Sequence, residues 1–126
     1  MVGIAAITYT TLAIIVIFFQ FALAAGAPWG KLTLGGTHPG VLPKKLRIAA
    51  VAQALLIAGT AVIVCIEAGL LFPGLQAVSR IGIWFVVILY TISSILNLIT
   101  NSKWERRAGA PIAISMLVSS LIIALS

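Results

Sequence analysis

Four long apolar stretches divide the chain, at residues 3–24, 48–72, 81–101 and 108–125. Each is close to the roughly 20 residues that an α-helix needs to cross about 30 Å of hydrocarbon. A segment inside a bilayer must satisfy its own backbone hydrogen bonds, which favours helices over irregular structure. The pattern therefore predicts an all-α fold, a transmembrane four-helix bundle that forms a single domain over residues 1–126.

Composition supports a membrane protein. Apolar residues make up 62% of the chain and charged residues 8%, whereas about 25% of the residues in an ordinary soluble domain are charged. Cys65 is the only cysteine and lies in an apolar stretch, so an intrachain disulfide and a cysteine-based metal site are excluded. We expect no cofactor and no metal.

The first stretch has an alternative interpretation as a secretory signal peptide, because Ala22-Leu23-Ala24 resembles a small-residue cleavage site. No Lys or Arg precedes this stretch, and its apolar run is longer than the roughly 7 to 15 residues of a signal core. We therefore expect a retained helix.

The basic residues cluster in two of the three connections. Eight Lys or Arg stand against Glu67 and Glu105, and the second connection holds only Arg80 among them. In a soluble protein such an excess would suggest nucleic acid, but here it is interpreted by the positive-inside rule, and no nucleic-acid partner is expected. The two basic loops are predicted to face the cytoplasm, with both termini outside.

Polar residues recur along each stretch at helical spacing, and this predicts a polar seam on every helix. Such seams face the bundle interior, because polar groups avoid lipid. Simple interhelical hydrogen bonding is the alternative to a functional site. Gln20, Gln53 and Asn97 are expected to converge near the end that carries the basic loops. The predicted polar interior consists of Tyr9, Gln20, Gln53, Thr60, Glu67, Tyr90, Asn97 and Ser115.

A positive rim is predicted above this polar layer, where it would attract an anionic lipid headgroup or a small anion. A lone histidine in this rim is more typical of a turn than of a metal site, which needs several ligands. The rim residues are Lys31, His38, Lys44, Lys45, Arg47, Lys103, Arg106 and Arg107.

Glu67 is an ionisable residue within a predicted span, which by itself suggests a site for a proton or cation. About 20 residues separate it from Arg47, a rise of about 30 Å, so it lies near the far boundary of the membrane. An ion pair with Arg80 that closes the hairpin is the alternative, and both interpretations stay open.

The first connection, residues 25–47, is long and rich in Gly and Pro, with turn signals at Gly35-Gly36 and at His38-Pro39-Gly40. Long connections tend to be functional or disordered. An ordered loop that packs on the bundle or dips into the lipid headgroups is predicted from its apolar residues Trp29, Leu32, Leu34, Val41 and Leu42.

Several segments of the chain resemble one group of proteins. These segments are GAPWG at 26–30, Gly35-Gly36, Leu42-Pro43 followed by Arg47, and NLITNSKWERRAGAP at 97–111. They resemble a group of uncharacterised small bacterial four-span membrane proteins. The resemblance implies a location in the bacterial inner membrane and no particular activity. The motifs of fluoride channels and of small multidrug exporters, which are of similar size, are absent.

Two classes of function are compatible with these patterns. The first is an oligomeric transporter or channel-like subunit for a small solute or ion. The alternative is a non-transporting accessory or lipid-binding protein with a basic cytoplasmic face. The expected partners are the lipid bilayer, anionic lipid, and further copies of the chain or a membrane complex. An enzyme is not expected, because Glu67 and His38 are predicted on opposite sides of the membrane and cannot form an acid-base pair.

Overall fold

The computed structural model describes residues 1–33, 36–38 and 40–126. Leu34, Gly35 and Pro39 lie outside the described residues. The predicted turns at Gly35-Gly36 and at His38-Pro39-Gly40, and the packing of Leu34, therefore fall partly or wholly outside them.

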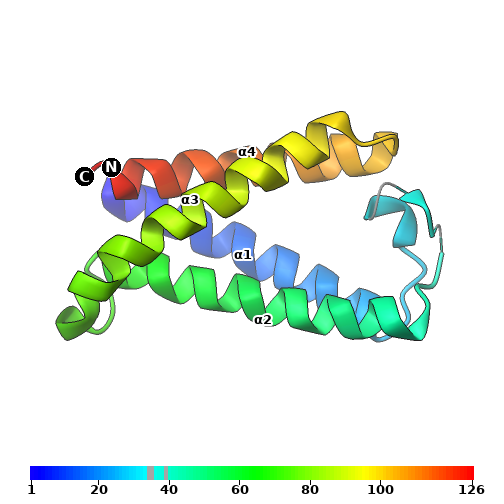
Figure 1. Cartoon of the computed structure of the whole chain (residues 1–126), viewed down its shortest axis with the longest axis horizontal. Helices are drawn as coiled ribbons and strands as arrows, with labels where there is room; N and C mark the ends of the chain where they lie inside the picture. The colour runs from blue at the N-terminus through cyan, green and yellow to red at the C-terminus, as the bar shows by residue number, and fades with distance from the viewer. Residues whose placement is uncertain (34–35, 39) are drawn as a thin grey trace.

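Four α-helices run up and down in sequence, as Figure 1 shows. They confirm the prediction of an all-α four-helix bundle, and each is long and apolar enough to span a membrane. Short 3-10 turns, η1 at Gly30–Leu32 and η3 at Pro73–Leu75, lie in the first and second connections. The helices are α1 at Val2–Ala24, α2 at Lys44–Glu67, α3 at Gln76–Ile99 and α4 at Lys103–Ala124.

The second hairpin turn departs from the apolar pattern. α2 ends at Glu67, although apolar residues continue to Phe72. Gly69 adopts a left-handed φ of 81° and donates its N–H to Ile66 O, while the Leu70 N–H returns to Cys65 O. This pattern is a Schellman motif, in which a left-handed residue, usually glycine, satisfies the last helical carbonyls. The turn therefore uses apolar residues that the hydrophobic pattern assigned to a span.

The same motif ends α1, and it explains the first glycine of GAPWG. Gly26 has a φ of 102° and donates its N–H to Leu23 O, and the Ala27 N–H donates to Ala22 O. A side chain at position 26 would be strained in this conformation.

Every helix begins before its apolar stretch does, and for α2 and α4 the residues at the start explain this. α2 starts at Lys44, directly after Pro43, whose carbonyl accepts the Arg47 N–H at 2.9 Å. α4 starts at Lys103, because the Ser102 hydroxyl accepts the Glu105 N–H at 3.2 Å as an N-cap. Charged first turns thus extend these helices beyond their apolar segments.

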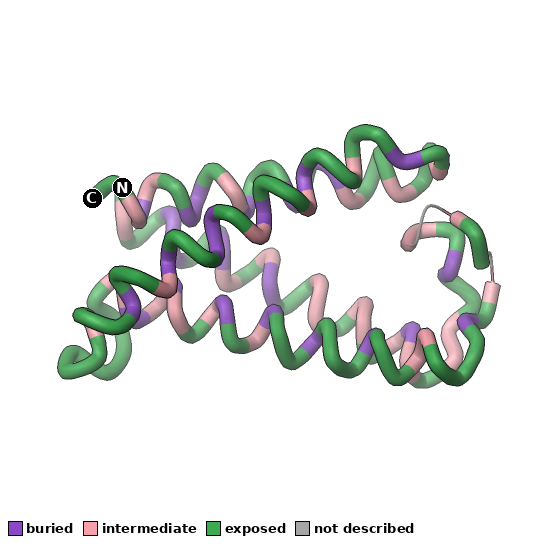
Figure 2. The backbone as a smooth tube through the Cα atoms, viewed as in Figure 1, coloured by how far each residue is buried: buried purple, intermediate pink, exposed green. Residues whose placement is uncertain are grey.

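The bundle is packed at one end and open at the other. We call the end that holds both termini the terminal end, and the opposite end, with the first and third connections, the loop end (Figure 1). The main buried cluster draws on all four helices. A second, smaller cluster at the loop end contains Leu23, Leu42 and Ala50, with no buried member from α3 or α4 among the described residues. The α1–α2 and α3–α4 hairpins therefore diverge toward the loop end, as the tube in Figure 2 shows.

Candidate functional site: a cavity between the two hairpins

A cavity of about 740 Å³ fills the space where the hairpins diverge. This volume is within the range of about 300 to 1,000 Å³ that is typical of small-molecule sites. All four helices and η1 contribute side chains, which are predominantly apolar with a polar minority. The polar lining residues are Gln20, Thr33, Gln53, Tyr90, Ser93, Asn97, Thr100, Asn101 and Glu105.

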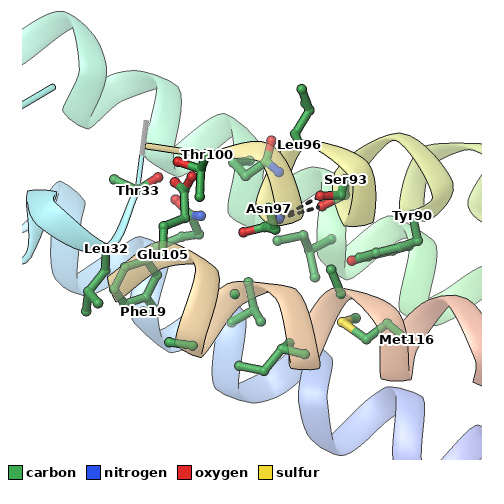
Figure 3. A pocket seen from close by; sticks show the side chains of 18 of the residues that line it. Phe19, Leu32, Thr33, Tyr90, Ser93, Leu96, Asn97, Thr100, Glu105 and Met116 are labelled. Carbon is green, nitrogen blue, oxygen red and sulfur yellow. Dashed lines mark hydrogen bonds between the residues drawn. The ribbon is translucent and has the colours of Figure 1, made fainter. Parts of the chain in front are cut away.

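The structure brings together the three residues expected to converge near the loop end. Gln20 from α1, Gln53 from α2 and Asn97 from α3 all line the cavity. Asn97 lies at its centre in Figure 3, where its amide nitrogen donates to the Ser93 carbonyl at 2.7 Å. The amide oxygen of Asn97 packs closely on α4, and a Cβ at Gly109 would overlap it. Because Gly109 has no side chain, it leaves room for this amide between α3 and α4.

Aromatic side chains close the cavity toward the terminal end. Tyr90 lines the cavity, and its ring meets the ring of Tyr9 edge to face, with 5.7 Å between centroids. The Tyr9 hydroxyl donates to Thr60 Oγ1 at 2.9 Å, and the Thr60 hydroxyl donates to Ile57 O at 2.7 Å. Tyr9 and Thr60 are 0% and 1% exposed. We call Tyr9, Thr60 and Tyr90 the tyrosine plug, because these residues separate the cavity from the terminal end.

Glu67 lies apart from the cavity, at the end of α2 near the second connection. One carboxylate oxygen accepts the Ser79 hydroxyl at 2.7 Å, and the other is 3.8 Å from Arg80 Nε. The Glu67 side chain is 11% exposed and that of Arg80 is 77% exposed. This geometry corresponds to the hairpin-closing ion pair, one of the two interpretations left open by the sequence.

Ser115 was expected in the polar interior, but the structure places it elsewhere. Its side chain is exposed, and its hydroxyl donates to Pro111 O one turn back at 2.7 Å. Ser119 and Ser120 are the buried serines of α4. Ser115 and Ser119 are four residues apart on α4, yet Ser115 is exposed and Ser119 is buried, so this spacing did not predict which serine packs inside.

The predicted rim does not line the cavity. None of its eight residues is among the lining side chains of the described chain. Arg47 Nε donates to Ala24 O at 2.9 Å, and Arg106 donates to Thr100 O at 3.1 Å, so both guanidinium groups bind helix ends. His38 Nδ1 is 3.0 Å from the Thr37 hydroxyl. The remaining rim residues Lys31, Lys44, Lys45, Lys103 and Arg107 are exposed.

The first connection roofs the cavity at the loop end. Leu32, the last residue of η1, and Thr33, which follows it, line the cavity at the loop end. The Ser102 hydroxyl donates to Lys31 O at 2.6 Å, and Lys31 Nζ lies 4.9 Å from the centroid of the Trp104 ring. We call these two contacts the Ser102 strap, because they fasten the first connection to the start of α4.

The roof keeps its shape because its backbone crosses itself closely. The Gly30 N–H donates to Gly40 O at 2.8 Å, and a Cβ at position 30 would overlap the His38 carbonyl. Trp29 stacks on Phe19 of α1, with ring centroids 6.2 Å apart and an interplanar angle of 4°. The last two residues of GAPWG therefore fold the loop back onto the bundle.

Sequence reasoning missed part of the polar lining. Ser93 and Thr100 belong to the cavity, together with Asn97, at spacings of four and three residues along α3. These spacings return to one helix face, so a search for polar residues at i, i+4 and i+7 would have found them. Thr33 carries no such signal, because a loop has no fixed periodicity.

Comparison with models of protein families, with curated proteins and with solved structures finds no match. Among the described residues, no group of three or more His, Cys, Asp or Glu is arranged to hold a metal ion.

Proposed function

We propose that the protein is a carrier-type transport subunit of the membrane, with the cavity between the hairpins as its ligand site. The observation that carries this proposal is a cavity of about 740 Å³ that is lined by amides and hydroxyls and ends at the tyrosine plug. A carrier needs a site within the span that is closed on one side, and access then alternates by movement of one helical unit against another. Two hairpins that pack at one end and diverge at the other are suited to such movement.

The basic loops are proposed to face the cytoplasm of a bacterial cell, with the protein in the inner membrane and both termini outside. Support comes from the positive-inside rule, since the loop end carries seven of the eight basic residues and the remaining one, Arg80, lies in the first turns of α3 at the terminal end. The cavity then faces the cytoplasmic half of the membrane. The cavity is formed within one chain. One protomer is therefore the binding unit, even when copies assemble into the proposed homo-oligomer.

Thiol labelling tests whether access to the cavity alternates. The native Cys65 is replaced by Ser, and a single cysteine is introduced as Asn97→Cys, with Ile95→Cys as the control. Asn97 lines the cavity, whereas Ile95 is 52% exposed on α3 and outside it. A membrane-impermeant thiol reagent is then applied to inverted vesicles, which present the loop end, and to spheroplasts, which present the terminal end.

The carrier proposal expects Asn97→Cys to react rapidly in inverted vesicles and more slowly, but measurably, in spheroplasts. Ile95→Cys should react in neither, because thiols in hydrocarbon are not ionised. Reaction of Asn97→Cys in inverted vesicles only, under all conditions, would contradict alternating access. A cavity that never opens toward the terminal end is a binding site and not a transport site.

The second candidate is a non-transporting lipid-binding protein. It is favoured by an apolar stripe along the edge of the cavity on α3. Ile92, Leu96 and Ile99 line the cavity and are 53%, 57% and 69% exposed. Such a stripe offers a surface for an acyl chain. A basic face that recruits anionic lipid, as in the sequence-based hypothesis, would use the exposed lysines at the loop end.

A further inference from the structure

From the chemistry of the cavity lining, we infer that the ligand is an amphiphile with an apolar chain and a hydrogen-bonding head that carries no negative charge. The head lies among Gln20, Asn97 and Thr100 beneath the roof, and the chain lies along the Ile92–Ile99 edge of α3. This inference rests on the proposal that the cavity is the ligand site, and it adds the class of ligand.

The head carries no negative charge because the cavity supplies hydrogen bonds without a cation. Its polar lining consists of amides and hydroxyls, and Glu105 is its only acidic or basic side chain among the described residues. An anionic head would find no Lys or Arg in the lining, at a cost that the low dielectric of the membrane increases. The anionic ligand that the sequence suggested therefore does not suit the cavity.

Polar and apolar side chains lie next to each other along the cavity, as Figure 3 shows. Glu105, Thr100 and Thr33 lie toward the roof, beside Leu32 and Phe19, and Asn97 lies at the centre. Tyr90 and Met116 mark the deep end. A ligand that contacts both kinds of side chain has one polar and one apolar part.

The route of entry also indicates an amphiphile. The roof narrows the entrance at the loop end, where Leu32 and Thr33 line the cavity and the Ser102 strap holds the loop to α4. The exposed stripe on α3 shows that the cavity continues outward between the hairpins at the depth of the apolar helices. A spanning helix presents such exposed Ile and Leu side chains to lipid. A molecule already dissolved in the bilayer can therefore enter sideways, and an acyl chain can remain in the opening.

Native mass spectrometry of the purified full chain tests the ligand class. The probes are 1-oleoylglycerol and its 3-phosphate, offered in equal amounts, because they share one acyl chain and differ in the charge of the head. Glycerol alone tests whether the chain is needed. We expect 1-oleoylglycerol to be retained about tenfold more than the phosphate, and a large excess of glycerol not to displace it.

Two variants locate the site. Ser93→Phe places a ring in the cavity and should reduce retention of 1-oleoylglycerol about tenfold. Ile95→Phe adds comparable bulk to the lipid-facing side of the same helix and should retain the ligand as the native chain does. If Ser93→Phe fails to fold, Asn97→Leu replaces it, because this change removes the central amide at similar volume.

Equal or greater retention of the phosphate would overturn the inference that the head carries no negative charge. Displacement by glycerol would overturn the need for an apolar chain. Unchanged retention in the folded cavity variant would place the amphiphile elsewhere and overturn the inference. These outcomes are separate from thiol labelling of Asn97→Cys, which reports alternating access whatever the ligand, so failure of the ligand class and failure of the carrier proposal can be told apart.

Discussion

The hydrogen bond between Tyr9 and Thr60 ties α1 to α2 deep in the bundle, and its removal should cost measurable stability. The bond is 2.9 Å long and both residues are buried. Interhelical hydrogen bonds in membrane proteins contribute on average about 0.6 kcal/mol and at most about 1.7 kcal/mol. Tyr9→Phe removes the donor and leaves Thr60 bonded to Ile57 O, so its expected loss lies in this range.

Thr60→Val should cost more than Tyr9→Phe does. It preserves shape but removes the acceptor of a tyrosine hydroxyl that is 0% exposed. A buried donor deprived of its partner costs about 1 to 3 kcal/mol. In the double variant the tyrosine hydroxyl is gone as well, so its loss of stability should be smaller than the sum of the single losses by about 0.6 to 1.7 kcal/mol.

Reversible unfolding by SDS in mixed micelles, followed by tryptophan fluorescence, gives the three free energies of unfolding. Ser115→Ala is a suitable control, because Ser115 is exposed and its hydroxyl donates to Pro111 O within its own helix. Losses that add to within about 0.3 to 0.5 kcal/mol would show that the two residues are not coupled. That result would refute the assignment of the tyrosine plug as a hydrogen-bonded unit.

Three further changes test separate features. Gly30→Ala should speed digestion of the first connection by trypsin, because its Cβ would overlap the His38 carbonyl, and an unchanged digestion rate would contradict the close crossing of this loop. Ser94→Ala should leave the free energy of unfolding unchanged or raise it, because the buried Ser94 hydroxyl oxygen has no hydrogen-bond partner in the described structure; a loss above about 1 kcal/mol would show that it has one. Arg80→Gln should cost less than about 1 kcal/mol, and less still at high salt, because the Arg80 side chain is 77% exposed in its pair with Glu67; a large, salt-independent loss would contradict a surface ion pair.

The number of helices was predictable because hydrocarbon thickness fixes the length of an apolar span. The helix ends were less predictable, because hydropathy does not register capping. Gly69 ends α2 although apolar residues continue beyond it. Ser102 starts α4 at the charged residues that precede its apolar stretch. Both signals are local, a glycine in a left-handed conformation and a serine three residues before a glutamate.

The cavity was predictable in part. Gln20, Gln53 and Asn97 were expected to share a layer, and they line one cavity, because depth along a helix follows directly from rise per residue. Which side of a helix faces the bundle interior is harder to predict when the helix is apolar on most sides. Ser115, for example, was expected in the interior and is exposed. The expected role of the basic residues depended on loop conformation, which decides whether a lysine such as Lys31 points into a cavity or onto an indole ring.

The Ser102 strap limits the mechanics of the molecule. In this conformation packing joins the hairpins at the terminal end, and the strap joins them again at the loop end through Lys31 and Ser102, 71 residues apart in sequence. While the terminal end stays packed, the main movement left to the hairpins is a change in the angle between them. The reach of the first connection sets the largest value of that angle, so the length of this loop acts as a mechanical stop on how far the hairpins can swing apart.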